Sequence, residues 1–212
     1  MACSKPAPGR TSPNRRNFAG SASTTPAAQR RQHERPAAAV LRPALPCPAD
    51  QAQAIGRWRD EQGLDGRAVP LANLHLTLAF LGAQPADALA EIARLGESIH
   101  AEAFELRLDR LISLGKGFTC LAPEQPPRAL GDLVALLRAG LAERGLPVDD
   151  RPFLPHLTLM RQAGERRHAT TPTFAWPVES FALYVSEQKE GGVRYRPLRH
   201  WPLRRSTAAA AS

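Results

Sequence analysis

The chain lacks the residue patterns that build disulfide frameworks, metal centres and membrane spans. Its three cysteines, Cys3, Cys47 and Cys120, are odd in number and far apart. This spacing argues against disulfides and a zinc site and favours a reducing compartment, so we expect a cytoplasmic protein. Because His-Glu-x-x-His and paired aspartate clusters are missing, no metal or other cofactor is expected. No apolar stretch approaches the roughly 20 residues that span a bilayer, so we expect a soluble protein without a membrane partner.

The signatures of two large enzyme classes are missing as well. Ser186 does not lie in a Gly-x-Ser-x-Gly turn, so a serine hydrolase is unsupported. There is no Gly-x-x-x-x-Gly-Lys-Ser/Thr loop, and Gly191-Gly192 is typical of a hairpin turn rather than of a nucleotide cradle. Arg15-Arg16 has the form of a twin-arginine export signal, but no apolar core of about 7–15 residues follows it, so export is not expected.

Positive charge is concentrated at the N-terminus. Of the formal net charge of +8, residues 1–36 carry +6, from seven basic residues and one acidic residue. The segment is rich in Ala, Ser, Thr and Pro and poor in large apolar side chains, which predicts a disordered basic tail. Such a tail is usually solvated, and RNA phosphate contacts are the alternative. We expect one folded domain over residues 37–203 and a frayed end over residues 204–212.

The tetrapeptide His-Leu-Thr-Leu occurs twice, beginning at His75 and at His156. Each copy lies in an apolar run typical of a buried strand, NLHLTLAFLG and FLPHLTLMR. Alternate side chains of a strand share a face, so His75 should lie beside Thr77 and His156 beside Thr158, with leucines turned to a core. One copy alone would most simply contain a packed strand histidine. The duplication, which involves two of only six histidines, favours a functional pair.

The remaining patterns predict an α+β fold. Strands that alternate with helices but are joined partly by hairpins indicate mixed or antiparallel sheets. The 81-residue offset between the motifs suggests two pseudo-symmetric lobes with outer helices, whose motif strands face each other across a central cleft. Pro43 predicts an edge or distorted position for the first strand. The expected helices are 48–62, 87–99 and 128–144, and the expected strands are 40–46, 73–82, 104–111, 116–122, 153–161, 181–186 and 193–198.

Two histidines and two threonines around one point suit acid–base chemistry on a phosphate. A neutral imidazole takes a proton from water as the water attacks phosphorus, and a protonated one gives a proton to the departing sugar oxygen. Imidazole suits both roles because its unperturbed pKa lies near neutrality. The threonine hydroxyls can donate hydrogen bonds to the non-bridging oxygens, where negative charge builds up. Arg161, at the end of the second run, is either a phosphate or base contact or a solvated strand-end residue.

On these residues the chain resembles the 2H phosphoesterase superfamily, which is defined by paired His-x-Thr/Ser-x motifs. Within it the chain is most similar to the RNA 2′,3′-cyclic phosphodiesterases, also called the 2′–5′ RNA ligase group. The resemblance extends over roughly residues 40–203 and includes NLHLTLAFLG, RPFLPHLTLMR and the closing segment LYVSEQKEGGVRYRPLRHWPL. It implies a bilobal α+β fold with both motifs in a central cleft and an enzyme that needs no metal.

The resemblance also implies a role for each candidate residue. His75 would be the proton donor to the leaving oxygen and His156 the acceptor that activates water. Thr77 and Thr158 would bind the phosphate, and Arg161 would lie near the nucleotide. The implied reaction opens a terminal 2′,3′-cyclic phosphate to a 2′-phosphate, and its reverse joins ends through a 2′–5′ bond. The implied partners are RNA ends or nucleotide cyclic phosphates, and we expect a monomer.

One segment departs from that family. Its first strand is usually an aromatic-rich Arg-Leu-Phe-Phe-Ala-Leu type, whereas this chain has VLRPAL at residues 40–45. The departure brings base stacking there, and the strand itself, into question. Two alternatives stay open: a 2H esterase that acts on another small cyclic or nucleotide phosphate, and a non-catalytic nucleotide- or RNA-binding module. The intact His and Thr of both motifs favour an enzyme, because a binding module needs no pair of proton carriers.

Overall fold

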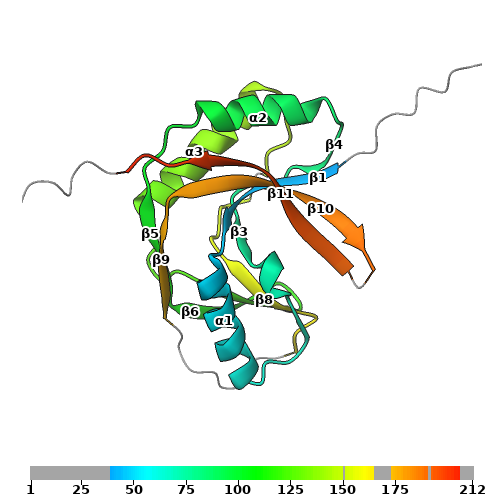
Figure 1. The fold of residues 1–212 in the computed structure, drawn as a ribbon, viewed down its shortest axis with the longest axis vertical. Coiled ribbons are helices and arrows are strands. Elements are labelled where there is room, and N and C mark those ends of the chain that lie inside the picture. Colours follow the sequence, from blue (N-terminus) through cyan, green and yellow to red (C-terminus); the bar gives the residue numbers. More distant parts are fainter. Residues whose placement is uncertain (1–38, 150, 165–172, 191, 206–212) are drawn as a thin grey trace, which may run out of the picture. The chain divides into compact units, whose positions relative to one another are not determined.

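The computed structural model describes residues 39–149, 151–164, 173–190 and 192–205. The tail expected over residues 1–36 lies outside these ranges, as does most of the end expected to fray. Arg204 is tied to the fold, because its N–H donates to the carbonyl of Ala101 at 2.9 Å. In chain order (Figure 1) the elements are β1 (Ala39–Pro46), α1 (Ala49–Glu61), β2 (Arg67–Ala68), the 3-10 helix η1 (Leu71–Asn73), β3 (His75–Thr77), β4 (Gly82–Gln84), α2 (Ala88–Ser98), β5 (Phe104–Leu108), β6 (Arg110–Leu114), β7 (Phe118–Ala122), α3 (Arg128–Glu143), β8 (Leu157–Arg161), β9 (Phe174–Val178), β10 (Ser180–Lys189) and β11 (Gly192–Pro202).

Most strands belong to one nine-stranded sheet with the order β11-β10-β1-β3-β8-β7-β6, to which β2 and β4 add at β8 and β1. β5 and β9 form a separate two-stranded sheet. The pairs between these strands are antiparallel, which confirms the predicted α+β class. The motif strands β3 and β8 lie at the centre, with strands on both sides. They are direct neighbours within one sheet, a closer relationship than the expected one of facing each other across a cleft.

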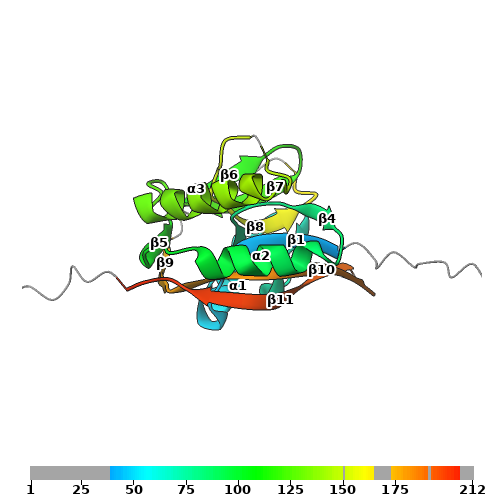
Figure 2. The ribbon, with the colours of Figure 1, turned by 90° about the horizontal axis from the view of Figure 1, so that it is seen from above.

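Helices α2 and α3 pack against each other and lie side by side in both ribbon views (Figures 1 and 2). Gly140 of α3 permits this approach, because a Cβ at that position would collide with Leu95 of α2. In α2, Ile92 and Leu95 are buried as predicted, but Leu89 is 37% exposed, since the buried stripe instead begins at Ala88. None of the helices in the described ranges is long and apolar enough to cross a membrane. The predicted stripe of α3 is fully buried and consists of Leu130, Leu133, Leu137 and Leu141.

Strand β1 lies inside the sheet, between β10 and β3, so the edge position expected from Pro43 is wrong. The carbonyl of Pro43 accepts a hydrogen bond from the N–H of Leu78 at 2.9 Å. In a strand the N–H and C=O of one residue point to the same side, so the donor that proline lacks would also face that side. There β1 changes partner, from β3 at residues 44–46 to β4 at residues 39–41. Pro43 is tolerated because it lies in the gap between these two short partners.

Two of the predicted strands are divided. The NLHLTLAFLG run forms β3 and β4, with irregular backbone over residues 78–81. The run 104–111 divides at Asp109, so that β5 pairs with β9 while β6 pairs with β7. At the division the carboxylate of Asp109 accepts a hydrogen bond from the N–H of Glu124 at 2.6 Å. Strand β9 is not predicted by the sequence pattern, because Pro177 interrupts it, and this proline is tolerated in a two-stranded sheet, where each strand is an edge.

Candidate active site

One strand register brings the two tetrapeptides together. Leu76 of β3 pairs with Leu157 of β8 in antiparallel orientation. Antiparallel partners run in opposite directions, so this pair sets His75 opposite Thr158 and Thr77 opposite His156. Both leucines are buried in the core, with 1% and 0% of their surface exposed. The four polar side chains therefore share the opposite face of the sheet.

The two histidines are held in the same way. Nδ1 of His75 lies 2.7 Å from the carbonyl oxygen of Asn73, and Nδ1 of His156 lies 2.8 Å from that of Leu154. Because a carbonyl can only accept, each Nδ1 is the donor, and the neutral ring has its acceptor at Nε2. Each imidazole thus bonds the carbonyl two residues before it and leaves Nε2 for a substrate. The sequence repeat has a matching structural repeat.

The environment of His75 favours a neutral ring. Its centroid lies 5.8 Å from that of Tyr184 and 4.7 Å from that of Tyr195. The pKa of His75 is lowered from 6.5 to about 4, mainly by burial and also by the charges of Arg42, Arg161 and His156, while the hydrogen bond to Asn73 raises it. The contribution of His156 indicates that the two imidazoles are close enough to sense each other's charge. At neutral pH His75 is uncharged in the free protein.

Thr158 lies beside a buried thiol on the neighbouring strand. Sγ of Cys120, on the neighbouring strand β7, is 3.8 Å from Oγ1 of Thr158. Cys120 is 0% exposed, as its apolar surroundings in the sequence predict. Burial raises the pKa of the Cys120 thiol to about 11, so it stays protonated near neutral pH and is not a nucleophile. Its role at the site is to pack beside Thr158.

Arg161 reaches the same face because β8 contains a bulge. Between the pairs Cys120–Thr158 and Thr119–Met160, strand β7 advances by one residue and β8 by two. The extra residue changes the alternation of side chains, so Arg161 turns to the face of Thr158 although it lies three residues beyond it. There Nη2 of Arg161 donates to the hydroxyl of Tyr195 at 3.2 Å. Arg161 is therefore held beside His75 and is not a solvated strand-end residue.

Three further residues at this face are not indicated by the motifs. Asn73 donates from its side-chain amide to the carbonyl of Val193 at 2.7 Å and accepts from the N–H of Tyr195 at 3.1 Å. Its own carbonyl holds His75, so Asn73 couples that ring to strand β11. Tyr195 contacts both His75 and Arg161. Arg42 of β1 stacks on Tyr195, and its position inside an apolar strand is the sequence signal that could have identified it.

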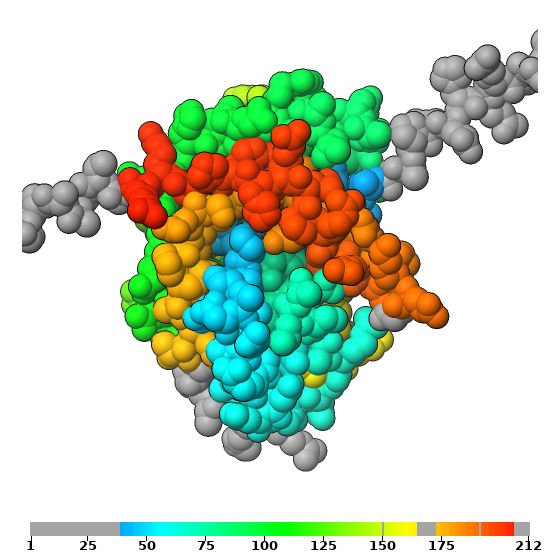
Figure 3. All heavy atoms as spheres, in the orientation of Figure 1, coloured from blue at the N-terminus to red at the C-terminus, as the bar shows by residue number. Residues whose placement is uncertain are grey.

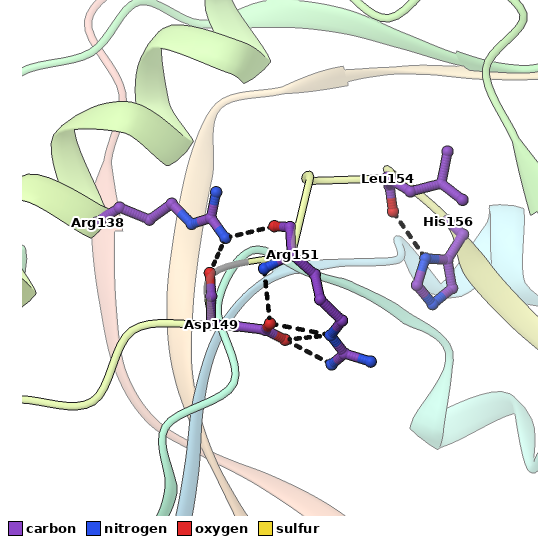
Figure 4. A network of polar contacts seen from close by, with 5 residues as sticks. All are labelled: Arg138, Asp149, Arg151, Leu154 and His156. Carbon is purple, nitrogen blue, oxygen red and sulfur yellow. Dashed lines mark hydrogen bonds and ion pairs between the residues drawn. The ribbon is translucent and has the colours of Figure 1, made fainter.

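The loop that carries His156 is fixed by α3. Nη2 of Arg138 donates to the carbonyl oxygens of Asp149 and Arg151, the latter at 2.7 Å (Figure 4). Nε of Arg151 in turn donates to Oδ1 of Asp149 at 2.9 Å. Leu154, whose carbonyl orients His156, follows in the same loop. Arg138 therefore acts on His156 through the backbone.

One cavity is lined by two of the four motif side chains, and a second by residues beside them. The larger, of about 400 Å³, is lined by Thr77, His156, Phe80 and Leu154 among others, and the last two are 49% and 51% exposed. The smaller, of about 280 Å³, is lined by Arg161 and by residues of η1, β2 and β11. In Figure 3 the orange hairpin of β10 and β11 lies beside the cyan residues around η1. Within the described ranges, no group of three or more His, Cys, Asp or Glu residues could hold a metal ion.

Comparison with known proteins agrees with this arrangement. The family model for the 2′-5′ RNA ligase superfamily matches residues 46–190, a span that includes both motifs and Arg161. The chain belongs to this superfamily. Its membership confirms the resemblance seen in the two tetrapeptides and their flanks.

Relatives within the superfamily are similar over most of their length. A protein of Escherichia coli (strain K12) named RNA 2′,3′-cyclic phosphodiesterase is 38% identical over 165 residues, or 76% of this chain and 94% of the relative. A protein of the same name from Thermus thermophilus is 36% identical over 157 residues, or 65% and 76%. The crystal structure of E. coli LigT complexed with 3′-AMP has a TM-score of 0.74 at 37% identity and covers 78% of this chain and 98% of that chain.

Proposed function

We propose that this chain hydrolyses 2′,3′-cyclic phosphates at RNA ends to 2′-phosphomonoesters, by a metal-independent mechanism with two histidines. The observation that carries the proposal is the register of Leu76 and Leu157, which places two equivalently anchored imidazoles and two threonines on one face. The names of the two relatives and the nucleotide bound to LigT support the substrate class.

In the proposed reaction Nε2 of His156 accepts a proton from the water that attacks phosphorus, and Nε2 of His75 donates a proton to O3′. The bond between phosphorus and O3′ breaks as the bond to the water oxygen forms, so the phosphate remains on O2′. One proton enters His156 and one leaves His75, and exchange with solvent restores both. The assignment of donor and acceptor follows the superfamily resemblance.

Proton donation requires a charged His75, whereas its pKa in the free protein is about 4. The phosphodiester carries a negative charge that would lie beside the imidazole and oppose the charges of Arg42 and Arg161. An anion next to an imidazole favours the protonated form of that histidine. We infer that substrate binding raises the pKa of His75. The imidazole can then carry the proton that it donates to the leaving oxygen O3′.

The threonines and Arg161 are assigned to the phosphate. Thr77 and Thr158 each lie opposite a catalytic histidine, so their hydroxyls can donate to the two non-bridging oxygens. Arg161, held by Tyr195, supplies a fixed positive charge beside His75. With a 5′-hydroxyl attacking phosphorus in place of water and O3′ leaving as before, the same groups would join RNA ends through a 2′–5′ bond.

The test is a defined RNA oligonucleotide that ends in 2′,3′-cyclic phosphate, incubated with the protein in excess EDTA. We expect hydrolysis to continue and the product phosphate to map to O2′. Mononucleotide 2′,3′-cyclic phosphates serve as the comparison, and faster turnover of the oligonucleotide would support RNA ends as the substrate. A 3′-phosphate product, or activity that requires added metal, would contradict the mechanism.

A further inference from the structure

Arg42 belongs to the face that carries the motif side chains. In the register of β1 with β3, Pro46 lies opposite His75 and Ala44 opposite Thr77. Arg42 precedes Ala44 by two positions and so projects to the same face, away from the core side of Leu41 and Leu45. On that face Arg42 is the next residue of β1 after Ala44, the residue that lies opposite Thr77.

The guanidinium of Arg42 is fixed in this place. Its Nη2 donates to Oγ of Ser186 at 2.9 Å, and its central carbon lies 4.4 Å from the ring centre of Tyr195 and 5.3 Å from that of Phe80. Tyr195 is the residue that also contacts His75 and receives the hydrogen bond of Arg161. Two arginines and a histidine therefore surround a single tyrosine.

Within the described ranges, this cluster of positive charge has no matching carboxylate. Among the described residues, neither Arg42 nor Arg161 forms an ion pair with an acidic side chain, and Nε of Arg42 is buried without a hydrogen-bond partner. Burial lowers the pKa of Arg42, and its charge lowers that of His75 more than the charge of Arg161 does. A partly buried cation without a counterion is unfavourable, and a bound anion offsets this cost.

We propose that Arg42 is a phosphate-binding residue of this site, which contacts the substrate phosphate together with Arg161 and holds the 2′-phosphomonoester product most tightly. The inference rests on the proposed function, because that reaction converts a singly charged diester into a monoester with a second ionisable oxygen. Two guanidiniums around Tyr195 match the larger charge of the product.

A purely structural role for Arg42 is the competing explanation, since the same side chain stacks on Tyr195 and bonds Ser186. The two explanations differ in what happens to phosphate affinity. We would measure the Kd of adenosine 2′-phosphate and of inorganic phosphate by calorimetry for the wild-type protein and for Arg42→Gln. Arg199→Gln is the matched control, because it removes the same charge from an exposed residue that pairs with Leu183, on the other face of the sheet.

We expect Arg42→Gln to weaken adenosine 2′-phosphate binding roughly 10- to 100-fold and Arg199→Gln to change it less than about twofold. Affinity of Arg42→Gln within about twofold of wild type would overturn the inference. A second readout needs no variant: the Arg42 Nε–H signal in ¹⁵N spectra should shift when inorganic phosphate is added, and a signal unmoved at saturation would also overturn it. Failure of the wild-type protein to hydrolyse RNA cyclic phosphate would instead contradict the proposed function, and the phosphate measurements would still decide the role of Arg42.

Discussion

Leu76 and Leu157 lie opposite each other in neighbouring antiparallel strands, buried on the face away from the motif histidines. Neither leucine takes part in the proposed chemistry, yet their pairing decides it. Since side chains alternate along a strand, a slip of one residue in either strand would turn a His and a Thr into the core. The core thus specifies the register, and the register positions the catalytic groups.

Loss of either imidazole should abolish most of the activity. We expect His75→Ala and His156→Ala each to lower kcat by about 10²- to 10⁴-fold, because each removes one of the two proton transfers. His200→Ala, an exposed histidine of β11, is the control and should behave as wild type. Steady-state hydrolysis of a 2′,3′-cyclic-phosphate oligonucleotide measures the effect, with circular dichroism to verify folding. Either motif variant keeping a tenth or more of wild-type kcat would be incompatible with the mechanism.

The depressed pKa of His75 predicts how stability depends on pH. As the pH falls from about 6.5 to about 4, the unfolded chain takes up a proton at this residue that the folded chain does not, so stability is lost. The loss attributable to His75 should reach roughly 3 kcal/mol at pH 4. Urea denaturation at several pH values should show a flatter profile for His75→Asn than for wild type. His100→Asn, at an exposed position, should keep the wild-type slope, and parallel curves for wild type and His75→Asn would refute the assignment.

The hydroxyl of Tyr195 should act on substrate binding through Arg161. Tyr195→Phe removes the acceptor of the 3.2 Å hydrogen bond but keeps the ring beside His75. We expect KM to rise about 3- to 10-fold with kcat within about twofold, because the guanidinium becomes less fixed while both imidazoles stay in place. Tyr184→Phe is the comparison, since that ring also contacts His75. An equal rise in KM for both variants would show that the hydrogen bond to Arg161 has no special role.

Arg138 should control the position of His156 from a distance. Arg138→Met removes the donor to the carbonyls of Asp149 and Arg151 and frees the loop that leads to Leu154. We expect kcat to fall about tenfold at unchanged KM, because the imidazole loses orientation while the phosphate contacts remain. Arg128→Met is the control, since this arginine lies on the same helix and pairs with Asp132 at 3.7 Å. Equal kinetics for the two variants would exclude the proposed role.

The sequence predicts those parts of the fold that depend on local periodicity. The leucine stripe of α3 predicts its buried face, and the repeated tetrapeptide predicts two strands whose His and Thr share a face. Long-range pairing decides the rest. Arg161 faces the site because of a bulge between β7 and β8, and no pattern within the β8 segment reveals that extra residue. Pro43 is accepted in a central strand because β3 and β4 leave a gap beside it. Arg42 becomes a site residue only once β1 lies between β3 and β10.

The central claim is that His75 and His156 serve one phosphate. Its most direct test is an NMR titration of the wild-type protein with adenosine 2′-phosphate, observing the imidazole signals of both histidines. The account predicts that both rings respond together and saturate at one equivalent, and that the pKa of His75 rises from about 4 as the anion binds. A response of one ring alone, or a pKa of His75 that stays unchanged at saturation, would contradict it.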